Sequence, residues 1–410
     1  MNVKFKYSNQ IKEIDLPEES NLQIIQPNEV PKKNEKEVIQ NSLKDKLSIF
    51  LQNVKKLLII VNDGTRATPT VKVIEEIYPQ IEKLEVTFVV ALGSHRKPTE
   101  KEYHNIFGRF YKIYKNNIIY HDAKNGDMLE LGTTSLGNKI KVNKLAVEHD
   151  KILIVSSVEP HYFAGYTGGR KSILPGISVY ETIEKNHSFA LLPEAKIMQL
   201  EGNPVHEDML EAAAMLPTET WACLLVIDKD KNVFSAEFDR INEAFYKIIP
   251  AADSIYKVPI KHQADIVIAI VEMPLDIDLY QSQKAIENAR NAIKEDGIFI
   301  LVSACRQGIG NDNFYKLLSS CTTPNEVFSK IEKEYRLGYH KAAKFVDFMQ
   351  KYQLWIVSEI DDEKLQKIFI KTKPDLQTAI NDAIRIKGRE ADILIIREAG
   401  IIVPGVIKTP

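Results

Sequence analysis

The residues best suited to chemistry lie in one stretch, from His161 to His187, which begins and ends with a histidine. Between the two histidines come the glycines and basic residues Gly165, Gly168, Gly169, Arg170 and Lys171. An apolar run at 151–157 precedes the stretch and is predicted to be a buried strand, because it is short and rich in β-branched residues. A strand, a glycine-rich loop and a helix start commonly bind phosphate, since backbone N–H groups and the helix dipole face the anion. Taken alone, however, the stretch is better explained as a solvated turn beside structural histidines.

A second polar cluster, Asp63, Thr65 and Arg66, follows a predicted buried strand at 56–61. Its side chains and the helix start after it could hold a phosphate. An Asx turn that caps the helix explains the same residues equally well. The sequence leaves these two interpretations open.

Two further segments carry candidate side chains. His95 follows the predicted strand at 86–92 in a Gly-Ser-His-Arg segment, either as an acid–base residue or as a helix cap. Gln281 and Lys284 lie three positions apart, so they share one face of a predicted helix. Lys284 by itself would most often be a solvated side chain.

The elements that must position these residues alternate between strand and helix. Such alternation predicts mostly parallel α/β sheets, in which ligands bind at the carboxyl ends of strands. At 410 residues the chain is too long for a single hydrophobic core of ordinary size. The alternating pattern of strands and helices starts again near residue 260. We therefore expect two α/β domains with an active-site cleft between them. The predicted boundaries are 1–260 for the first domain, which 403–410 rejoin, and 261–402 for the second.

Composition excludes several other classes of protein. A net charge of −2 and the absence of clustered Lys and Arg argue against a nucleic-acid partner. No apolar run approaches the roughly 20 residues of a membrane span. The N-terminal residues alternate like a strand and lack a signal-peptide core. Three cysteines without C-x-x-C spacing argue against a disulfide framework. We expect a cytoplasmic protein that binds neither membrane nor nucleic acid.

Taken together, five segments resemble the nickel-dependent lactate racemase family. They are NDGTRATP (62–69), ALGSHR (91–96), EPHYFAGYTGGRKSILPG (159–176), NH (186–187) and LYQSQK (279–284). The resemblance spans both predicted domains in order, and the long central segment is its most specific part. The central segment lacks the G-x-G-x-x-G fingerprint of dinucleotide-binding enzymes.

The resemblance implies a cofactor and a role for each candidate residue. The family is known for a nickel pincer nucleotide that is joined to a lysine, here Lys171, with His187 as the nickel ligand. His95 and His161 are then the two acid–base residues. The remaining cofactor contacts are implied to be Asp63, Thr65, Arg66, Gly168, Gly169 and Arg170. The substrate contacts are implied to be Arg66, Tyr280, Gln281 and Lys284.

The chemistry of a 2-hydroxy carboxylate suits these residue types. Its α-hydrogen is a poor acid, so it is removed more easily as hydride while a base takes the hydroxyl proton. Two enantiomers present their hydroxyl groups on different sides, which calls for two bases, and histidine titrates near neutrality. Arg and Lys suit an anionic substrate. A soft sulfur pair with one imidazole suits nickel.

We therefore predict a racemase or epimerase of a lactate-type 2-hydroxy acid, loaded by cofactor-synthesis proteins that bind it transiently. Two alternatives remain open from the sequence. One is a family member without cofactor or activity that binds hydroxy acids or nucleotides. The other is an NAD-dependent 2-hydroxyacid oxidoreductase. The sequence does not indicate which 2-hydroxy acid is the substrate.

Overall fold

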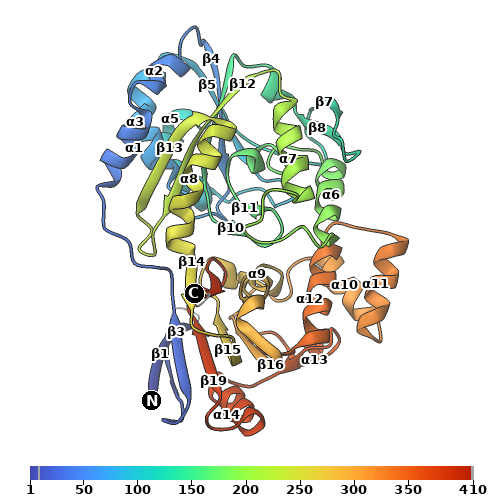
Figure 1. Cartoon of the computed structure of the whole chain (residues 1–410). Coiled ribbons are helices and arrows are strands. Elements are labelled where there is room, and N and C mark those ends of the chain that lie inside the picture. Colours follow the sequence, from blue (N-terminus) through green and yellow to red (C-terminus); the bar gives the residue numbers. More distant parts are fainter. Residues whose placement is uncertain (8–9, 408–410) are drawn as a thin grey trace. The chain divides into compact units, whose positions relative to one another are not determined.

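The structure is a computed structural model of the chain, which describes residues 1–7 and 10–407. The chain divides into two compact units (Figure 1). Residues 29–255 form what we call the central unit, and residues 1–28 together with 256–410 form the terminal unit. The predicted α/β class with mostly parallel sheets is confirmed in both units. The cleft expected between the domains stays a prediction.

The central unit is built on a six-stranded sheet of order β13-β12-β9-β4-β5-β6. Its neighbouring strands are parallel except for β13, which is antiparallel to β12. The strands of this unit, including the small hairpins β7–β8 and β10–β11, are β4 (Lys56–Asn62), β5 (Glu85–Ala91), β6 (Ile118–Tyr120), β7 (Met128–Thr133), β8 (Lys139–Asn143), β9 (Lys151–Ser157), β10 (Pro160–His161), β11 (Gly165–Tyr166), β12 (Glu219–Ile227) and β13 (Val233–Arg240). The helices are α1 (Glu35–Leu43), α2 (Lys46–Phe50), α3 (Thr70–Ile81), α4 (Glu100–Phe107), α5 (Phe110–Tyr114), α6 (Tyr180–Ser188), α7 (Pro204–Ala214) and α8 (Ile241–Tyr256), with 3-10 turns at Lys144–Val147, Gly169–Ser172 and Phe189–Leu191.

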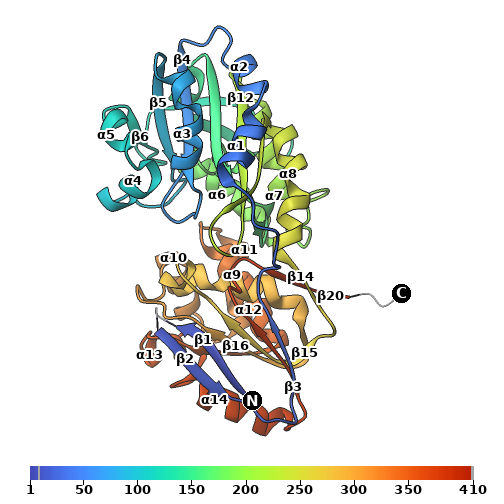
Figure 2. The same cartoon turned by 90° about the vertical axis from the view of Figure 1, so that its left-hand side faces the viewer.

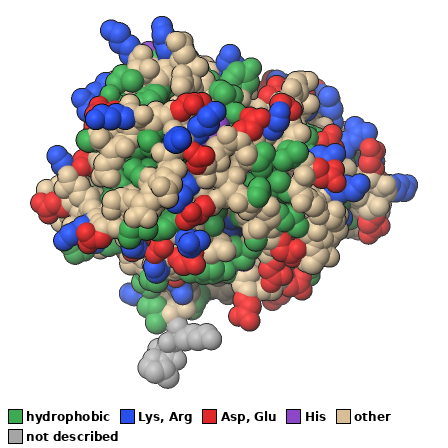
Figure 3. Space-filling model, turned by 90° about the horizontal axis from the view of Figure 1, so that it is seen from above, with side chains coloured by type: hydrophobic (Ala, Val, Ile, Leu, Met, Phe, Trp, Pro, Cys, Tyr) green, Lys and Arg blue, Asp and Glu red, His purple; other side chains and the backbone are tan. Residues whose placement is uncertain are grey.

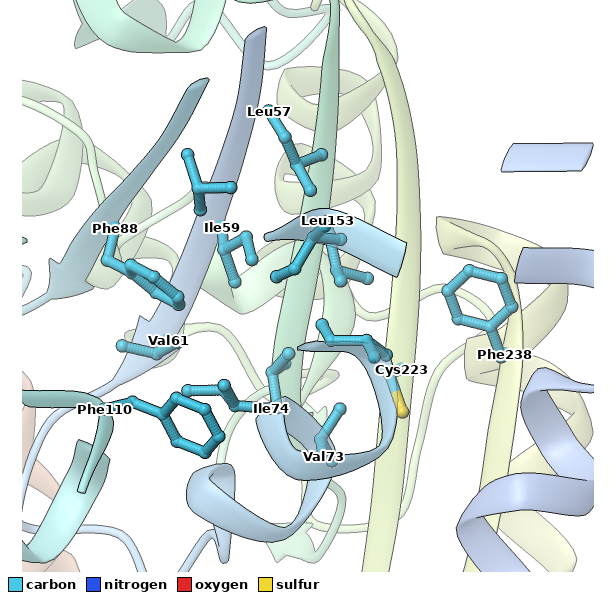
Figure 4. Packing of buried hydrophobic residues seen from close by; sticks show 14 of the residues in the cluster. Leu57, Ile59, Val61, Val73, Ile74, Phe88, Phe110, Leu153, Cys223 and Phe238 are labelled. Atoms are coloured by element: carbon cyan, nitrogen blue, oxygen red, sulfur yellow. The ribbon is translucent and has the colours of Figure 1, made fainter. Parts of the chain in front are cut away.

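The core of the central unit explains why these strands form. In β4 the residues from Leu57 to Val61 are all at most 1% exposed, as expected for a parallel strand that is covered on both faces. Figure 4 shows Val73 and Ile74 of α3 near Val61 of β4, in the cluster that also contains Leu57 and Ile59. This packing fixes the carboxyl end of β4, where the polar cluster begins.

The terminal unit has a six-stranded parallel sheet of order β18-β17-β16-β15-β19-β3. Its strands are β1 (Asn2–Tyr7), β2 (Gln10–Asp15), β3 (Asn21–Ile25), β14 (Lys257–Ile260), β15 (Ala264–Ile270), β16 (Ile293–Val302), β17 (Gln353–Val357), β18 (Lys371–Thr372), β19 (Asp392–Ile396) and β20 (Val403–Val406). Its helices are α9 (Leu279–Ala289), α10 (Asp312–Ser319), α11 (Pro324–Lys333), α12 (Tyr339–Lys351), α13 (Asp362–Gln366) and α14 (Leu376–Lys387), with 3-10 turns at Leu275–Ile277 and Arg290–Ala292.

The predicted assignment of residues 1–28 to the first domain is wrong. β3 pairs with β19 of the terminal sheet, and the hairpin β1–β2 adds Val3, Phe5 and Ile14 to the core of that unit. Figure 1 shows β3 beside β19. Short alternating strands show which of their faces is buried, but they do not show which sheet edge they join. The chain therefore enters the central unit only after Asn28.

The predicted return of residues 403–410 to the first domain is also wrong. β20 pairs in parallel with β14, and both strands belong to the terminal unit (Figure 2). Residues 408–410 of that prediction lie outside the described residues. The division between the units falls between Ile255 and Tyr256, at the end of α8.

The starts of α4 and α6 differ in how they are capped. Thr99 and Glu102 form a reciprocal capping box at the start of α4. Ser178 does not cap α6: the helix begins at Tyr180, and the Ser178 hydroxyl donates to the Ile173 carbonyl at 2.8 Å. The glycine-rich loop is therefore followed by the 3-10 turn Gly169–Ser172 before α6 begins.

The surface carries both signs of charge. On the face drawn in Figure 3, basic and acidic side chains are interspersed. Within residues 1–7 and 10–407, no helix combines the length and the apolar character that a membrane crossing requires.

Candidate active site

The polar clusters of the central unit follow three neighbouring strands, β5, β4 and β9. Asp63 comes directly after β4, His95 follows β5, and Glu159 follows β9. Because these strands are parallel, their carboxyl ends lie at one edge of the sheet. The backbone N–H of Gly93 also donates to the Gly176 carbonyl at 3.0 Å, which ties the loop of His95 to the loop of Lys171.

Asp63 and His95 form a hydrogen-bonded pair at this edge. Asp63 Oδ2 lies 2.6 Å from His95 Nδ1, and Asp63 Oδ1 accepts from the Thr65 hydroxyl at 2.6 Å. Burial raises the pKa of Asp63, but the bonds from His95 and Thr65 and the charge of Arg66 outweigh it, and the pKa falls from its ordinary value of 3.8 to about 2. The carboxylate is therefore charged at neutral pH, so Nδ1 of His95 must be the donor. Nε2 is then the ring nitrogen that can accept a proton.

Arg66 is paired with a residue to which the sequence gave no role. Its Nη1 contacts Glu159 Oε1, and both side chains are about one-fifth exposed, at 20% and 22%. Glu159 is itself fixed, because its N–H donates to the Thr167 hydroxyl at 2.9 Å and its carbonyl accepts from the Thr167 N–H at 2.8 Å. Glu159 stands in the motif EPHYFAGY, so its place in the motif was visible but its partner was not.

Three other predicted residues converge on the ring of Phe163. The ring centroid of His161 lies 4.5 Å from that of Phe163, and the ring centroid of His187 lies 5.1 Å from it. Lys171 Nζ lies 5.5 Å from the same centroid. The side chains of His161, Lys171 and His187 therefore lie around the Phe163 ring. Phe163 lies in the motif EPHYFAGYTGGRKSILPG, but the sequence gave it no role, since an aromatic residue in a loop is usually a packing residue.

His161 is held differently from His95. It ends β10, is 7% exposed, and its Nδ1 accepts from the Ala164 N–H at 3.3 Å. In a neutral ring this bond keeps the proton on Nε2, which is the hydrogen-bond donor form. The distance is at the long end for such a bond, so the contact is weak. The two histidines therefore present different ring forms, with an acceptor at Nε2 of His95 and a donor at Nε2 of His161.

Comparison with known proteins places this site in a family. Residues 7–198 match the family model "Lactate racemase N-terminal domain", and residues 260–403 match "Lactate racemase C-terminal domain". The chain belongs to the lactate racemase family. The predicted resemblance is thereby confirmed, and the protein is an isomerase of the racemase class.

Individual members of the lactate racemase family show how much of the chain the likeness covers. The lactate racemase of Thermoanaerobacterium thermosaccharolyticum is 32% identical over 346 residues, 80% of each chain. That of Lactiplantibacillus plantarum is 28% identical over 392 residues, 91% of this chain and 92% of the relative. The structure of the T. thermosaccharolyticum lactate racemase apoprotein has a TM-score of 0.90 and 28% identity, covering 99% of this chain and all of that one. A Thermotoga maritima protein shares the fold alone, with a TM-score of 0.74 and 16% identity over 92% of this chain and 100% of its own.

Arg170 requires a correction within this lactate racemase fold. It is completely buried, and its N–H groups donate to the carbonyls of Ala164 (2.8 Å), Tyr166 (3.2 Å) and Gly168 (3.3 Å) and to His206 Nδ1 (2.8 Å). Burial lowers its pKa to about 9. A side chain with no exposed surface cannot contact a cofactor in this conformation. We therefore reassign Arg170 from a cofactor contact to a residue that holds the loop.

The two glycines before Arg170 also have packing roles. Gly168 has φ +87, and a Cβ there would lie 2.6 Å from Val158 Cγ2. The Gly169 N–H donates to the Ser156 hydroxyl at 3.2 Å, so this group is already used within the protein. The close approach at Gly168 and the positive φ of Gly169 (+53) account for glycine at both positions. Their predicted contact with the cofactor stays a prediction.

The predicted substrate residues of the terminal unit lie on the first turns of α9. Tyr280, Gln281 and Lys284 are partly exposed there, whereas Ser282 and Gln283 between them are buried. Asp278 caps the helix by accepting from the Gln281 N–H at 2.7 Å. Buried Lys341 of α12, which the sequence did not single out, donates to the Tyr280 carbonyl, and its Nζ lies 3.9 Å from the centroid of the Tyr280 ring. Tyr280 is thus fixed in place beside the other two.

The residues assigned to the cofactor fit a single bound group. Lys171 and His187 both contact the ring of Phe163, so a group linked to the lysine lies within reach of the imidazole. Among the described residues there is no group of three or more His, Cys, Asp or Glu side chains that could hold a metal ion. A donor set of one imidazole suits a metal whose other ligands belong to the cofactor.

Proposed function

We propose that the protein racemises a lactate-type 2-hydroxy carboxylic acid, using a nickel pincer nucleotide attached through Lys171. The observation that carries the proposal is the cluster of His161, Lys171 and His187 around Phe163, within a family of lactate racemases. Lys171 is the attachment point and His187 the nickel ligand from the protein. When bound, the cofactor supplies a reversible acceptor for the α-hydrogen.

The protein's own residues handle the proton and the carboxylate. His95 accepts the substrate hydroxyl proton at Nε2, since Asp63 holds Nδ1 as the donor. The charge of Asp63 also stabilises the imidazolium that forms. Loss of the hydroxyl proton and of the α-hydrogen as hydride leaves a planar keto acid. Return of the hydride to the opposite face, with a proton from Nε2 of His161 in its imidazolium form, gives the other enantiomer and leaves His161 neutral and His95 protonated. Proton exchange with water then restores the starting forms.

His161 must change its hydrogen bond to complete this cycle. A histidine that exchanges a proton at Nε2 carries a proton on Nδ1 in both its neutral and its charged form. The Ala164 N–H now points at Nδ1 at 3.3 Å. We infer that this weak contact opens when substrate binds, and that His95 is the base in place beforehand.

The substrate carboxylate is assigned to Arg66, with Gln281, Lys284 and Tyr280 as further contacts from α9. Guanidinium can bind a carboxylate through two N–H groups, and Glu159 engages only one nitrogen of Arg66. Arg66 therefore keeps donors for a second carboxylate. The proposal excludes the NAD-dependent alternative, which uses a diffusible dinucleotide rather than a lysine-bound cofactor.

The experiment is racemisation of pure D- and L-lactate by protein made with and without the cofactor-synthesis proteins. Protein made with them is expected to form both enantiomers and to contain about one nickel per chain. Protein made without them is expected to be inactive and poor in nickel, because a single imidazole holds a divalent ion weakly. Stoichiometric nickel without the synthesis proteins, or racemisation that requires added NAD, would overturn the proposal. A panel of longer, aromatic and dicarboxylic 2-hydroxy acids then identifies the preferred substrate.

A further inference from the structure

Helix α7 carries three buried polar side chains, none of which the sequence singled out. They are Asn203 at its cap, His206 in its first turn and Asp208 in its second, with exposures of 0%, 2% and 0%. Buried polar groups are stable only when they are hydrogen-bonded. Each of these three bonds to a different segment of the active site.

Asn203 fixes the hairpin that begins with His161. Its Nδ2 donates to the Phe163 carbonyl at 2.9 Å, while its Oδ1 accepts from the N–H groups of Val205 and His206 at 3.1 and 3.3 Å. The same side chain therefore caps α7 and fixes the backbone of Phe163. The ring of Phe163 is the common neighbour of His161, Lys171 and His187.

His206 fixes the loop of Lys171 through Arg170. Its Nδ1 accepts from Arg170 Nε at 2.8 Å, so its Nε2 carries the proton and lies 3.2 Å from the Tyr246 hydroxyl. Burial, and then the charge of Arg170, lower the pKa of His206 to about 3, which keeps the ring neutral. The guanidinium of Arg170 also lies 3.9 Å from the centroid of the Phe245 ring. The guanidinium of Arg170 is therefore held by hydrogen bonds and by the Phe245 ring. Because Lys171 is the next residue, these contacts also hold the backbone at Lys171.

Asp208 fixes the helix turn of His187. Its Oδ2 accepts from Asn186 Nδ2 and from Asn138 Nδ2, both at 2.8 Å, and its Oδ1 accepts from the Thr134 hydroxyl at 2.6 Å. Asn186 directly precedes His187 in α6. The carboxylate thereby joins α6, α7 and the hairpin of β7 and β8.

We propose that Asn203, His206 and Asp208 are positioning residues, which set the geometry of the cofactor-holding side chains without touching the cofactor. The inference rests on the proposed function. Its specific content is a division of labour along α7: His206 governs attachment at Lys171, and Asp208 governs retention of nickel at His187. A general role in stability would affect both properties alike.

The test separates the two properties in protein made with the cofactor-synthesis proteins. The fraction of chains with an adduct on Lys171 is measured by intact mass and peptide mapping, and nickel is measured per adduct. His206→Leu is expected to lower the adduct fraction, and Asp208→Asn to lower nickel per adduct, each by about 10- to 100-fold, as for residues that support a metal ligand. Asp208→Asn should leave the adduct fraction near that of the wild type.

Two controls keep the result interpretable. Ile77→Ala removes a fully buried side chain of α3, in a hydrophobic cluster that includes no residue of α7, and serves as a variant of lowered thermal stability. His206→Asn retains an acceptor at the position of Nδ1, whereas His206→Gln moves its amide one bond further out. The fraction of chains with an adduct on Lys171 should be near the wild-type value in His206→Asn and lowered in His206→Gln. This comparison tests the role of His206 even if His206→Leu fails to fold.

The outcomes distinguish this inference from the proposed function. If wild-type protein carries neither adduct nor nickel, the proposed function falls and this inference falls with it. If the wild type carries both, but the α7 variants lose both in parallel as Ile77→Ala does, only the inference is overturned. Equal attachment in His206→Asn and His206→Gln would overturn it as well.

Discussion

Asp63→Asn tests the acid–base pair most sharply, because it changes a charge and a donor pattern with almost no change of shape. The pKa of Asp63 falls from 3.8 to about 2 although the group is buried. A shift of this size corresponds to roughly 2–3 kcal/mol in favour of the charged form, at about 1.4 kcal/mol per unit. Most of that interaction comes from His95 and Thr65, since these are the hydrogen-bond partners of the carboxylate.

The asparagine variant is expected to be correctly folded and nearly inactive. Its amide turns an N–H towards Nδ1 of His95, which then becomes an acceptor and moves the proton to Nε2. The base would then present a donor to the substrate hydroxyl. The equivalent change of tautomer in a serine-protease triad lowers kcat by about 10⁴-fold, and loss of a general base typically costs about 10²–10⁴-fold. We expect a loss of kcat/KM for D- and L-lactate within that range.

The assay is chiral analysis of initial rates, with nickel and Lys171 adduct measured on the same sample. Both are expected to stay near the wild-type values, because attachment and nickel ligation are assigned to Lys171 and His187, and the variant's amide keeps the shape of the Asp63 side chain for its predicted contact with the cofactor. Asp150→Asn is the matched control: its carboxylate accepts from the N–H groups of Lys55 and Lys56 at the opposite end of β4. A loss of less than threefold in Asp63→Asn, or an equal loss in Asp150→Asn, would refute this account of His95.

Three further predictions follow from the same site. Because the folded-state pKa of Asp63 lies below its ordinary value of 3.8, its stabilisation is complete above about pH 4 and is lost as pH falls towards 2; acid unfolding of Asp63→Asn, followed by circular dichroism, should therefore show a smaller loss of stability over that window than the wild type. Glu159→Gln should change the free energy of unfolding by no more than about 1 kcal/mol, as for a partly exposed ion pair. It should raise KM for lactate more than it lowers kcat, because Arg66 loses the group that holds it, and an unchanged KM would argue against Arg66 as the carboxylate contact. His95→Ala and His161→Ala should show opposite enantiomer preferences in the first half-reaction under rapid mixing; identical behaviour would mean that one of them only positions the substrate.

The sequence could predict those features that depend on local pattern. The buried runs at 56–61 and 151–157 became β4 and β9 nearly residue for residue, because β-branched apolar runs between polar ends have few alternatives. The position of Asp63 and His95 after neighbouring parallel strands followed from the same pattern. The family motifs then supplied roles that spacing alone left open.

The features that the sequence could not predict depend on contacts between distant residues. β3 pairs with β19, and the paired residues Asn21 and Asp392 are 371 positions apart. The alternation of polar and apolar residues in β3 does not indicate which strand it pairs with. The Arg66–Glu159 pair and the convergence on Phe163 likewise arise only when separate strand ends meet. Arg170 was misassigned for a related reason: a basic residue in a glycine-rich loop reads as an anion contact, and its complete burial appears only once α7 and α8 are in place.

The measurement that tests the central claim most directly is the fate of the α-hydrogen. L-lactate deuterated at carbon 2 is racemised in ordinary water by the loaded protein, and the D-lactate formed is examined for deuterium. If the hydrogen leaves and returns as hydride on a bound cofactor, the product keeps its deuterium. If a histidine instead removed it as a proton, exchange with water would replace it, and D-lactate carrying hydrogen at carbon 2 would contradict the proposed function.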